Sequence, residues 1–264
     1  MRLYRILAAG SLLALGLGWS GQVSATTIDK TLTVNVYQVC SDTGTNCAST
    51  GPAGDTYFAA EVNKIWAQAG ISVAFDFVRQ IDSSAFSNIN DSSTSHRFQD
   101  LAYAYGTGPS ATNVDMFLVH SVVGAYGEGW FGWGGLVIAM DDVMTFNGGI
   151  GRIDTIAHEL GHNLGLMPDN LSGSDGQGHS TIPQELMASG GIRSIPASLA
   201  DIAPSGLGLD LLSAGEIAIV RQSSLLHDIP EPATCLLLLG AVGTIAGSRR
   251  RRGHPSPMAE APGL

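Results

Sequence analysis

The stretch from residue 158 to residue 162 has the residue types and spacing of a metal-dependent hydrolase. It reads His158-Glu159-Leu160-Gly161-His162. On a helix, His158 and His162 would lie one turn apart on the same face, where both rings could reach one metal ion. Such an ion lowers the pKa of a water ligand to about 7, and Glu159 would lie beside it to accept the proton.

The residues around this stretch favour a buried helix with a metal site over a surface helix with two unrelated histidines. Ile156, Ala157, Leu160 and Leu164 are apolar, and two histidines without a role would be costly in a core helix. Gly165 follows where the helix is expected to end. The sequence therefore predicts a zinc site, with one catalytic Zn²⁺ held by His158 and His162.

The stretch continues as H-E-x-x-H-x-x-G, and Met187 follows downstream in Leu-Met-Ala-Ser-Gly. In these features the chain resembles the metzincin zinc metalloproteases. The resemblance implies an α+β fold: a twisted mixed sheet in an α/β-type N-terminal subdomain, an active-site helix, and a smaller C-terminal subdomain. It also implies that Met187 supports the metal from below without ligating it, and that Glu159 is the general base.

The third metal ligand departs from the family pattern, because Pro168 stands where the family has a histidine. Two residues could replace it, Asp169 and His179. The run from 179 to 187 is similar to the H-S-S-V-P-E-A-L-M run of the matrixin branch, so we favour His179. Residues 167–178 would then be an inserted loop. The alternative for His179 is a solvated loop histidine.

Apolar periodicity, β-branched residues and turn residues indicate the other elements. Strands are expected at 31–39, 71–78, 115–123 and 136–140, and helices at 55–69, 97–105, 154–164 and 213–223. The resemblance implies that the strand before the active-site helix is a sheet edge that pairs with the main chain of the substrate. This role falls on Gly135, Leu136, Val137 and Ile138. The Trp/Gly-rich loop 124–135 is expected either to rim the cleft or to pack its rings beneath it, and loop 190–209 to wall the pocket.

Composition and charge limit the function classes. The chain has 264 residues, 34 of them Gly, and 13 Lys and Arg against 23 Asp and Glu, for a net charge of −10. Residues 26–231 contain no basic patch, so a nucleic-acid partner is not expected. Calcium is compatible with this acidity, but no motif indicates it. Cys40 and Cys47 could form a small disulfide loop or remain free thiols.

Both ends of the chain carry export and sorting signals. Residues 1–25 are expected to be a signal peptide, and residues 26–229 one metzincin-like domain. Residues 230–252 combine Pro-Glu-Pro, a short apolar run and four arginines, which resembles a PEP-CTERM sorting segment; a simple tail anchor is the alternative. Residues 253–264 would then be a cytoplasmic tail. The resemblance implies an exosortase-type processing enzyme as a partner.

These features predict a secreted zinc endopeptidase that hydrolyses protein or peptide substrates. It would be anchored transiently in the inner membrane, by the C-terminal segment alone, and then reach the cell surface or the extracellular matrix. A surface or matrix protein that keeps the fold without catalysis is one alternative. A hydrolase of small amides that uses the same site is another.

Overall fold

A twisted, mostly parallel sheet organises the part of the chain that the computed structural model describes, which is residues 26–91, 94–171 and 173–230. The main path runs in the order β2-β1-β4-β7-β6, and a short β8 pairs with β1. All pairs along the main path are parallel except β6 with β7, and β8 is antiparallel to β1. The strands are β1 (Lys30–Cys40), β2 (Ile71–Asp82), β4 (Val114–Val119), β6 (Gly127–Gly129), β7 (Leu136–Ala139) and β8 (His227–Asp228).

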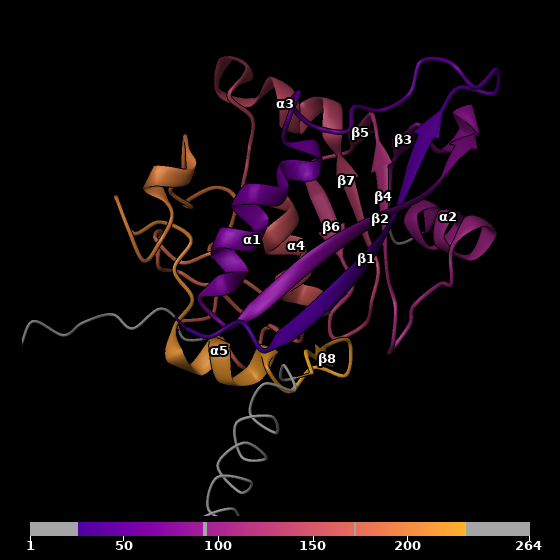
Figure 1. Cartoon of the computed structure of the whole chain (residues 1–264). Helices are drawn as coiled ribbons and strands as arrows, with labels where there is room; N and C mark the ends of the chain where they lie inside the picture. Colours follow the sequence, from indigo (N-terminus) through magenta and orange to yellow (C-terminus); the bar gives the residue numbers. More distant parts are fainter. Residues whose placement is uncertain (1–25, 92–93, 172, 231–264) are drawn as a thin grey trace, which may run out of the picture.

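Helices lie on both faces of this sheet (Figure 1). The helices are α1 (Ala59–Ala67), α2 (Arg97–Tyr105), α3 (Met140–Gly149), α4 (Thr155–Asn163) and α5 (Ala214–Val220). Helices α1 and α4 pack on one face and α2 on the other. The remaining elements are short: 3-10 turns at Thr56–Phe58, Ser84–Phe86 and Leu199–Asp201, and the small pair β3 (Asn88–Ile89) and β5 (Ser121–Val122). The fold class is therefore the predicted one, a mixed sheet with a helix behind the site.

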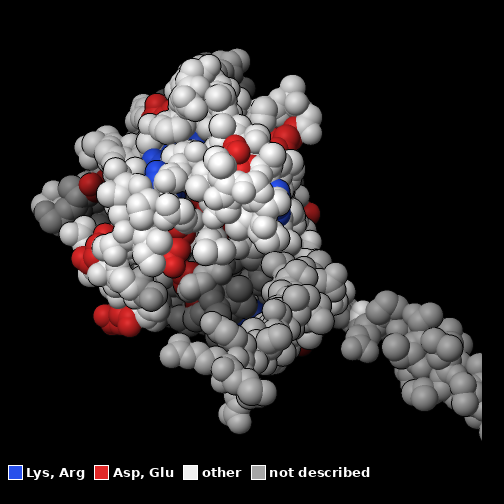
Figure 2. All heavy atoms as spheres, turned by 90° about the vertical axis from the view of Figure 1, so that its left-hand side faces the viewer, with Lys and Arg blue, Asp and Glu red and all other residues white. Residues whose placement is uncertain are grey.

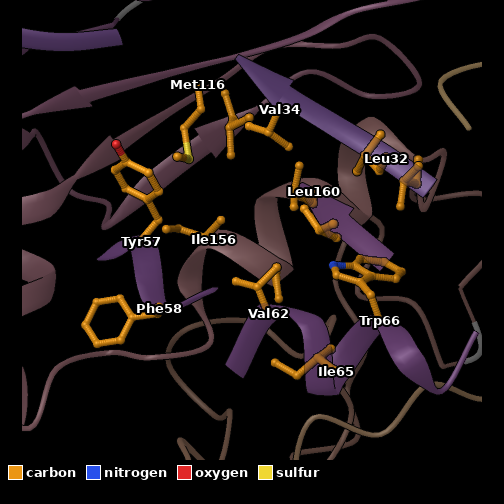
Figure 3. Packing of buried hydrophobic residues seen from close by; sticks show 14 of the residues in the cluster. Leu32, Val34, Tyr57, Phe58, Val62, Ile65, Trp66, Met116, Ile156 and Leu160 are labelled. Carbon is orange, nitrogen blue, oxygen red and sulfur yellow. The ribbon is translucent and has the colours of Figure 1, made fainter. Parts of the chain in front are cut away.

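Successive side chains of a strand point to opposite faces of the sheet, which explains how one strand contributes apolar residues to both faces. In β4, Met116 and Leu118 face α1 and α4, whereas Phe117 and Val119 face α2. All six residues of β4 are buried, as expected of a strand covered on both sides. Figure 3 shows Met116, Val34 and Leu32 from the strands meeting side chains of α1 and α4. This packing holds α4 against the sheet, and α4 carries the two histidines.

Several predicted elements are confirmed. The strand at 31–39, the helix at 97–105 and the active-site helix are present, and the capping box of Ser213 and Glu216 opens α5. Cys40 and Cys47 are joined by a disulfide. Asp154 precedes α4 as expected, but its side chain makes no cap hydrogen bond and instead pairs with Arg193 at 2.8 Å.

The predicted sheet edge is wrong. β7, which contains Leu136, Val137 and Ile138, lies between β4 and β6, and these three side chains are fully buried. The edge next to β7 is β6, a three-residue strand within the loop 124–135. Its sequence Gly-Glu-Gly has no alternation of apolar residues, so periodicity could not reveal it. Helix α3, directly after β7, was also not anticipated.

The predicted signal peptide, residues 1–25, and the predicted C-terminal segments from residue 231 onward lie outside the described residues. Within the described part, no helix combines the length and the apolarity needed to cross a bilayer.

One buried carboxyl outside the site predicts a pH-dependent stability. Burial and the neighbouring Asp55 raise the pKa of Glu61 on α1 to about 7, from 4.5. The folded state then binds this proton more tightly than the unfolded state, so stability falls as pH rises from 4.5 through about 7. We expect Glu61→Gln to melt a few degrees above the wild type at pH 8 and to lose that advantage at pH 5.

Thermal unfolding followed by circular dichroism at the two pH values measures this difference. Asp100→Asn, an exposed carboxyl on α2, is the control and should show no such pH dependence. An equal shift of Glu61→Gln at both pH values would contradict the assignment.

Candidate metal centre

Three imidazoles converge where α4 faces the C-terminal part of the chain. His158, His162 and His179 each offer a ring nitrogen, and these nitrogens all lie within 4.8 Å of one another. The ring centroids are 4.9 Å apart for His158 and His162, 5.4 Å for His158 and His179, and 5.5 Å for His162 and His179. The two histidines of α4 are buried, and His179 is partly exposed.

Backbone carbonyls orient the two helical histidines. Nδ1 of His158 lies 2.8 Å from the carbonyl of Leu186, and Nδ1 of His162 lies 3.1 Å from the carbonyl of Leu166. A proton on each Nδ1 leaves Nε2 of the ring with its lone pair free, and such partners commonly fix metal-ligating histidines. The guanidinium of Arg193 also contacts Nδ1 of His158 and donates to the Leu186 carbonyl at 2.9 Å.

His179 is placed by the inserted loop. The Asp175 amide donates to the His179 carbonyl at 2.8 Å, and the Thr181 amide donates to the Gly173 carbonyl at 2.9 Å, which closes the loop back on itself. An Asp175 carboxylate oxygen lies 3.4 Å from Nδ1 of His179. Asp175 was not among the predicted site residues; the only signal for it was its position four residues before His179.

Asp169, the other candidate for the third position, is exposed and lies outside the histidine cluster. Pro168 and Asp169 belong to the turn that follows α4, where the Asn170 amide donates to the Met167 carbonyl at 3.1 Å. Of the two residues considered at this position, the fold brings only His179 to the other histidines.

Burial keeps the helical imidazoles neutral. It lowers the pKa of His162 to about 4, and it holds the pKa of His158 well below its usual value, with Arg193 adding to the effect. Zinc binds neutral imidazoles, and three histidine nitrogens with one open position is a known catalytic zinc set. The residues present therefore fit a zinc ion.

Glu159 lies beside the histidines in a site that excludes much of the solvent. Its exposed fraction is 7%, and burial raises the pKa of its carboxyl to about 8. Two glycines of β6 allow the strand to pass this close. A Cβ at Gly127 would stand 2.9 Å from Cγ of Glu159, and a Cβ at Gly129 would stand 2.7 Å from its backbone oxygen. Close approach to Glu159 thus explains the glycines on both sides of Glu128.

Met187 lies against α4 behind the histidines and is fully buried. A Cβ at Gly161 would meet the Met187 sulfur at 2.5 Å, so a larger residue between the two histidines would displace the Met187 side chain. The Met187 carbonyl accepts a hydrogen bond from the Ser180 amide at 2.7 Å, directly after His179. Met187 thus contacts α4 at Gly161 and is tied to the segment that carries His179.

A cavity of about 390 Å³ opens beside the histidines. Glu159 and Tyr126 line it. Loop 190–209, which was predicted to form a wall of the pocket, contributes Gly190, Gly191 and Arg193. In the aromatic loop, Tyr126 lines the cavity, whereas Trp130 stacks on Phe98 with ring centroids 4.4 Å apart. The Phe131 ring centroid lies 4.9 Å from that of His162. The proposed substrate strand at Gly135 to Ile138 does not line this cavity.

Comparison with known proteins identifies the C-terminal signal. Residues 228–252 match the PEP-CTERM protein-sorting motif. The predicted sorting segment is confirmed. The motif indicates an exported protein with a C-terminal sorting tail that an exosortase recognises. No curated protein matches the chain.

Among solved structures, the chain is similar to archaemetzincin from Methanopyrus kandleri, with 9% identity, 73% of this chain and 94% of that chain covered, and a TM-score of 0.41. It is similar to mature mirolysin from Tannerella forsythia, solved with a cleaved peptide, with 14% identity, coverage of 76% and 95%, and a TM-score of 0.44. It is also similar to metalloproteinase-II from Bacteroides fragilis, with 16% identity and a TM-score of 0.41. That match covers 76% of this chain and 55% of the other. The roles of the site residues are argued from the geometry of this chain.

Proposed function

We propose that this protein is an exported zinc-dependent endopeptidase. The observation that carries the proposal is the convergence of three histidine nitrogens within 4.8 Å, from two segments of the chain, beside the buried carboxyl of Glu159. A structural zinc site would close all four positions with protein ligands, whereas three ligands and an adjacent carboxyl are typical of a hydrolase.

His158, His162 and His179 would hold the ion through ring nitrogens. When bound, the ion would lower the pKa of water and polarise the carbonyl of the scissile peptide bond. Glu159 would accept the proton of the attacking water and pass it to the leaving amine. Met187 would support the histidines from behind without touching the reacting atoms.

The substrate main chain is proposed to pair with β6 rather than with β7. β6 uses one of its edges to pair with β7 and is the last strand on that side of the sheet. Its glycines pack against Glu159, so an extended peptide on its other edge would pass beside the carboxyl. Pairing of this kind recognises the peptide backbone and leaves selectivity to the pockets.

The sorting motif at residues 228–252 supports an activity outside the cytoplasm. We propose that residues 1–25 direct export and that residues 26–229 form the catalytic domain. Residues 230–252 would hold the protein in the inner membrane, with residues 253–264 on the cytoplasmic side, until an exosortase-type enzyme acts near the Pro-Glu-Pro segment. The product would remain at the cell surface or in the extracellular matrix.

Metal content and protein hydrolysis, measured together on residues 26–229, test this function. We expect about one zinc ion per chain by elemental analysis, hydrolysis of casein or gelatin, loss of hydrolysis with a chelator, and recovery on adding zinc. Zinc without hydrolysis of proteins or small amides would favour the non-catalytic alternative. Hydrolysis of small amides alone would favour an amidase. A folded protein that takes up no zinc would end the proposal.

A further inference from the structure

The cavity beside the histidines has two arginines in its wall, Arg152 and Arg193, in a chain with only 13 Lys and Arg against 23 Asp and Glu. Figure 2 shows one face of this acidic molecule, on which red side chains are spread widely and blue ones are few. Two positively charged guanidinium groups at one cavity are therefore unusual in this acidic chain.

Arg193 already has its partners within the fold. Its Nε lies 2.8 Å from Oδ2 of Asp154, and its Nη1 donates to the Leu186 carbonyl at 2.9 Å. The charge of Arg193 is thus paired, and its contacts tie the start of α4 to the loop that carries Met187. Arg193 is a positioning residue for His158.

Arg152 lacks such partners. Its nearest carboxylate oxygen is Oδ1 of Asp154, 3.8 Å from its Nε, and Asp154 is already paired with Arg193. The exposed fraction of Arg152 is 6%. Its Nε and Nη2 are buried and have no hydrogen-bond partner in the described part of the chain. A buried guanidinium with unmet donors destabilises a fold unless an acceptor is supplied from outside.

The other carboxyls near this cavity do not supply that acceptor. Asp210 lies in the same buried charge cluster, but neither of its carboxyl oxygens has a hydrogen-bond partner in the described part of the chain. Glu159 lines the cavity and is assigned to the attacking water. Asp154 lies 2.8 Å from Arg193 but 3.8 Å from Arg152, so the guanidinium of Arg152 remains available to a ligand.

The surroundings hold the Arg152 guanidinium at the cavity wall. It lies over the Tyr126 ring, 4.7 Å from the centroid, and both residues line the cavity. A Cβ at Gly190 would stand 3.3 Å from Nη2 of Arg152, so glycine leaves room beside these donors. A guanidinium at this wall carries pairs of parallel N–H groups, which match the two oxygens of a carboxylate.

We propose that Arg152 binds a carboxylate of the substrate in this cavity, so that the enzyme prefers peptides with an acidic group close to the cleaved bond. This inference rests on the proposed function and names the substrate class for that site. A Glu or Asp side chain and a free C-terminal carboxylate both provide the required chemistry.

Matched peptides test the preference on the purified, zinc-loaded exported protein. Each pair has Glu or Gln directly before or directly after the cleaved bond, and a further pair has a free or an amidated C-terminus. We expect kcat/KM to favour the carboxylate member of at least one pair by about tenfold or more, the usual effect of a charge-assisted hydrogen bond. A response in a Glu/Gln pair means that the site binds a side-chain carboxylate. A response in the free/amidated pair means that it binds the C-terminal carboxylate of the peptide.

Substitution then assigns the preference to Arg152. In Arg152→Gln the ratio within the responding pair should fall towards one, and in Arg152→Lys it should remain above one. Arg79→Gln removes the same charge from an exposed position on β2 and should keep the wild-type ratio. If Arg152→Gln does not fold, the kcat/KM ratios of the wild type within each peptide pair still test whether a carboxylate is preferred. Ratios near one in every wild-type pair would overturn the inference.

A second measurement separates this inference from the proposed activity. Calorimetry with zinc-free protein compares binding of the Glu and Gln peptides without any turnover. If no peptide is cleaved but the Glu peptide still binds more tightly, the proposed function fails and the carboxylate site stands. If peptides are cleaved and both members of every pair bind and react equally, the function stands and the inference fails.

Discussion

Glu159→Ala is expected to keep zinc and to lose peptide hydrolysis by roughly 10²–10⁴-fold, the usual contribution of a positioned general base. The side chain lies in the cavity beside the histidines, where few water molecules could replace it. It is not a member of the histidine cluster, so its removal should leave the proposed ligands in place. Zinc per chain and kcat/KM on one peptide, measured on the same preparation, test both parts.

Glu61→Gln is the matched control for this variant. It also alters a buried carboxyl, but one on α1 that neither belongs to the histidine cluster nor lines the cavity. Its turnover should equal that of the wild type at a temperature where both are folded. Unchanged turnover in Glu159→Ala would exclude the base role, and loss of zinc would mean that the carboxyl supports the metal instead.

The second large effect is expected from His179→Ala. Losing one of three ligands should weaken zinc binding by more than the 10–100-fold that follows removal of an outer partner of a ligand. Competition with a chromogenic chelator measures the affinity, and elemental analysis measures the zinc retained after dialysis. Hydrolysis should decline with zinc occupancy.

Asp169→Ala is the control from the same insert. Asp169 is exposed and outside the histidine cluster, so its variant should bind zinc as the wild type does. The reverse result, with zinc lost in Asp169→Ala and kept in His179→Ala, would mean that residues 167–178 rearrange when the metal binds.

Local signals explain which parts of the fold could be predicted from the sequence. The apolar spacing around His158 and the glycine at 165 define α4, and the serine and glutamate of the capping box define the start of α5. In each case the residues that determine the structure lie within one or two turns of one another. The same holds for β4, whose apolar residues 116–119 are typical of a strand that is buried on both faces.

The parts that could not be predicted depend on contacts between distant segments. β6 exists because Gly127 and Gly129 fit against Glu159, which only the folded chain reveals. The family resemblance implied an edge strand before the active-site helix and led to β7, since Leu136 to Ile138 carry the apolar pattern and the Gly-Glu-Gly stretch carries none. Likewise, Asp154 has the position of a cap, but a distant arginine takes its carboxylate.

The inserted loop that presents His179 has a thermodynamic consequence. If this histidine is the third ligand, the ion acts as a removable cross-link between α4 and a segment some seventeen positions further along the sequence. Ordering that segment costs chain entropy, and ion binding, which favours the folded form alone, would offset it. Metal supply would then set how tightly the C-terminal part stays closed on the sheet, and metal-depleted protein would open there first, where a foreign protease could cut.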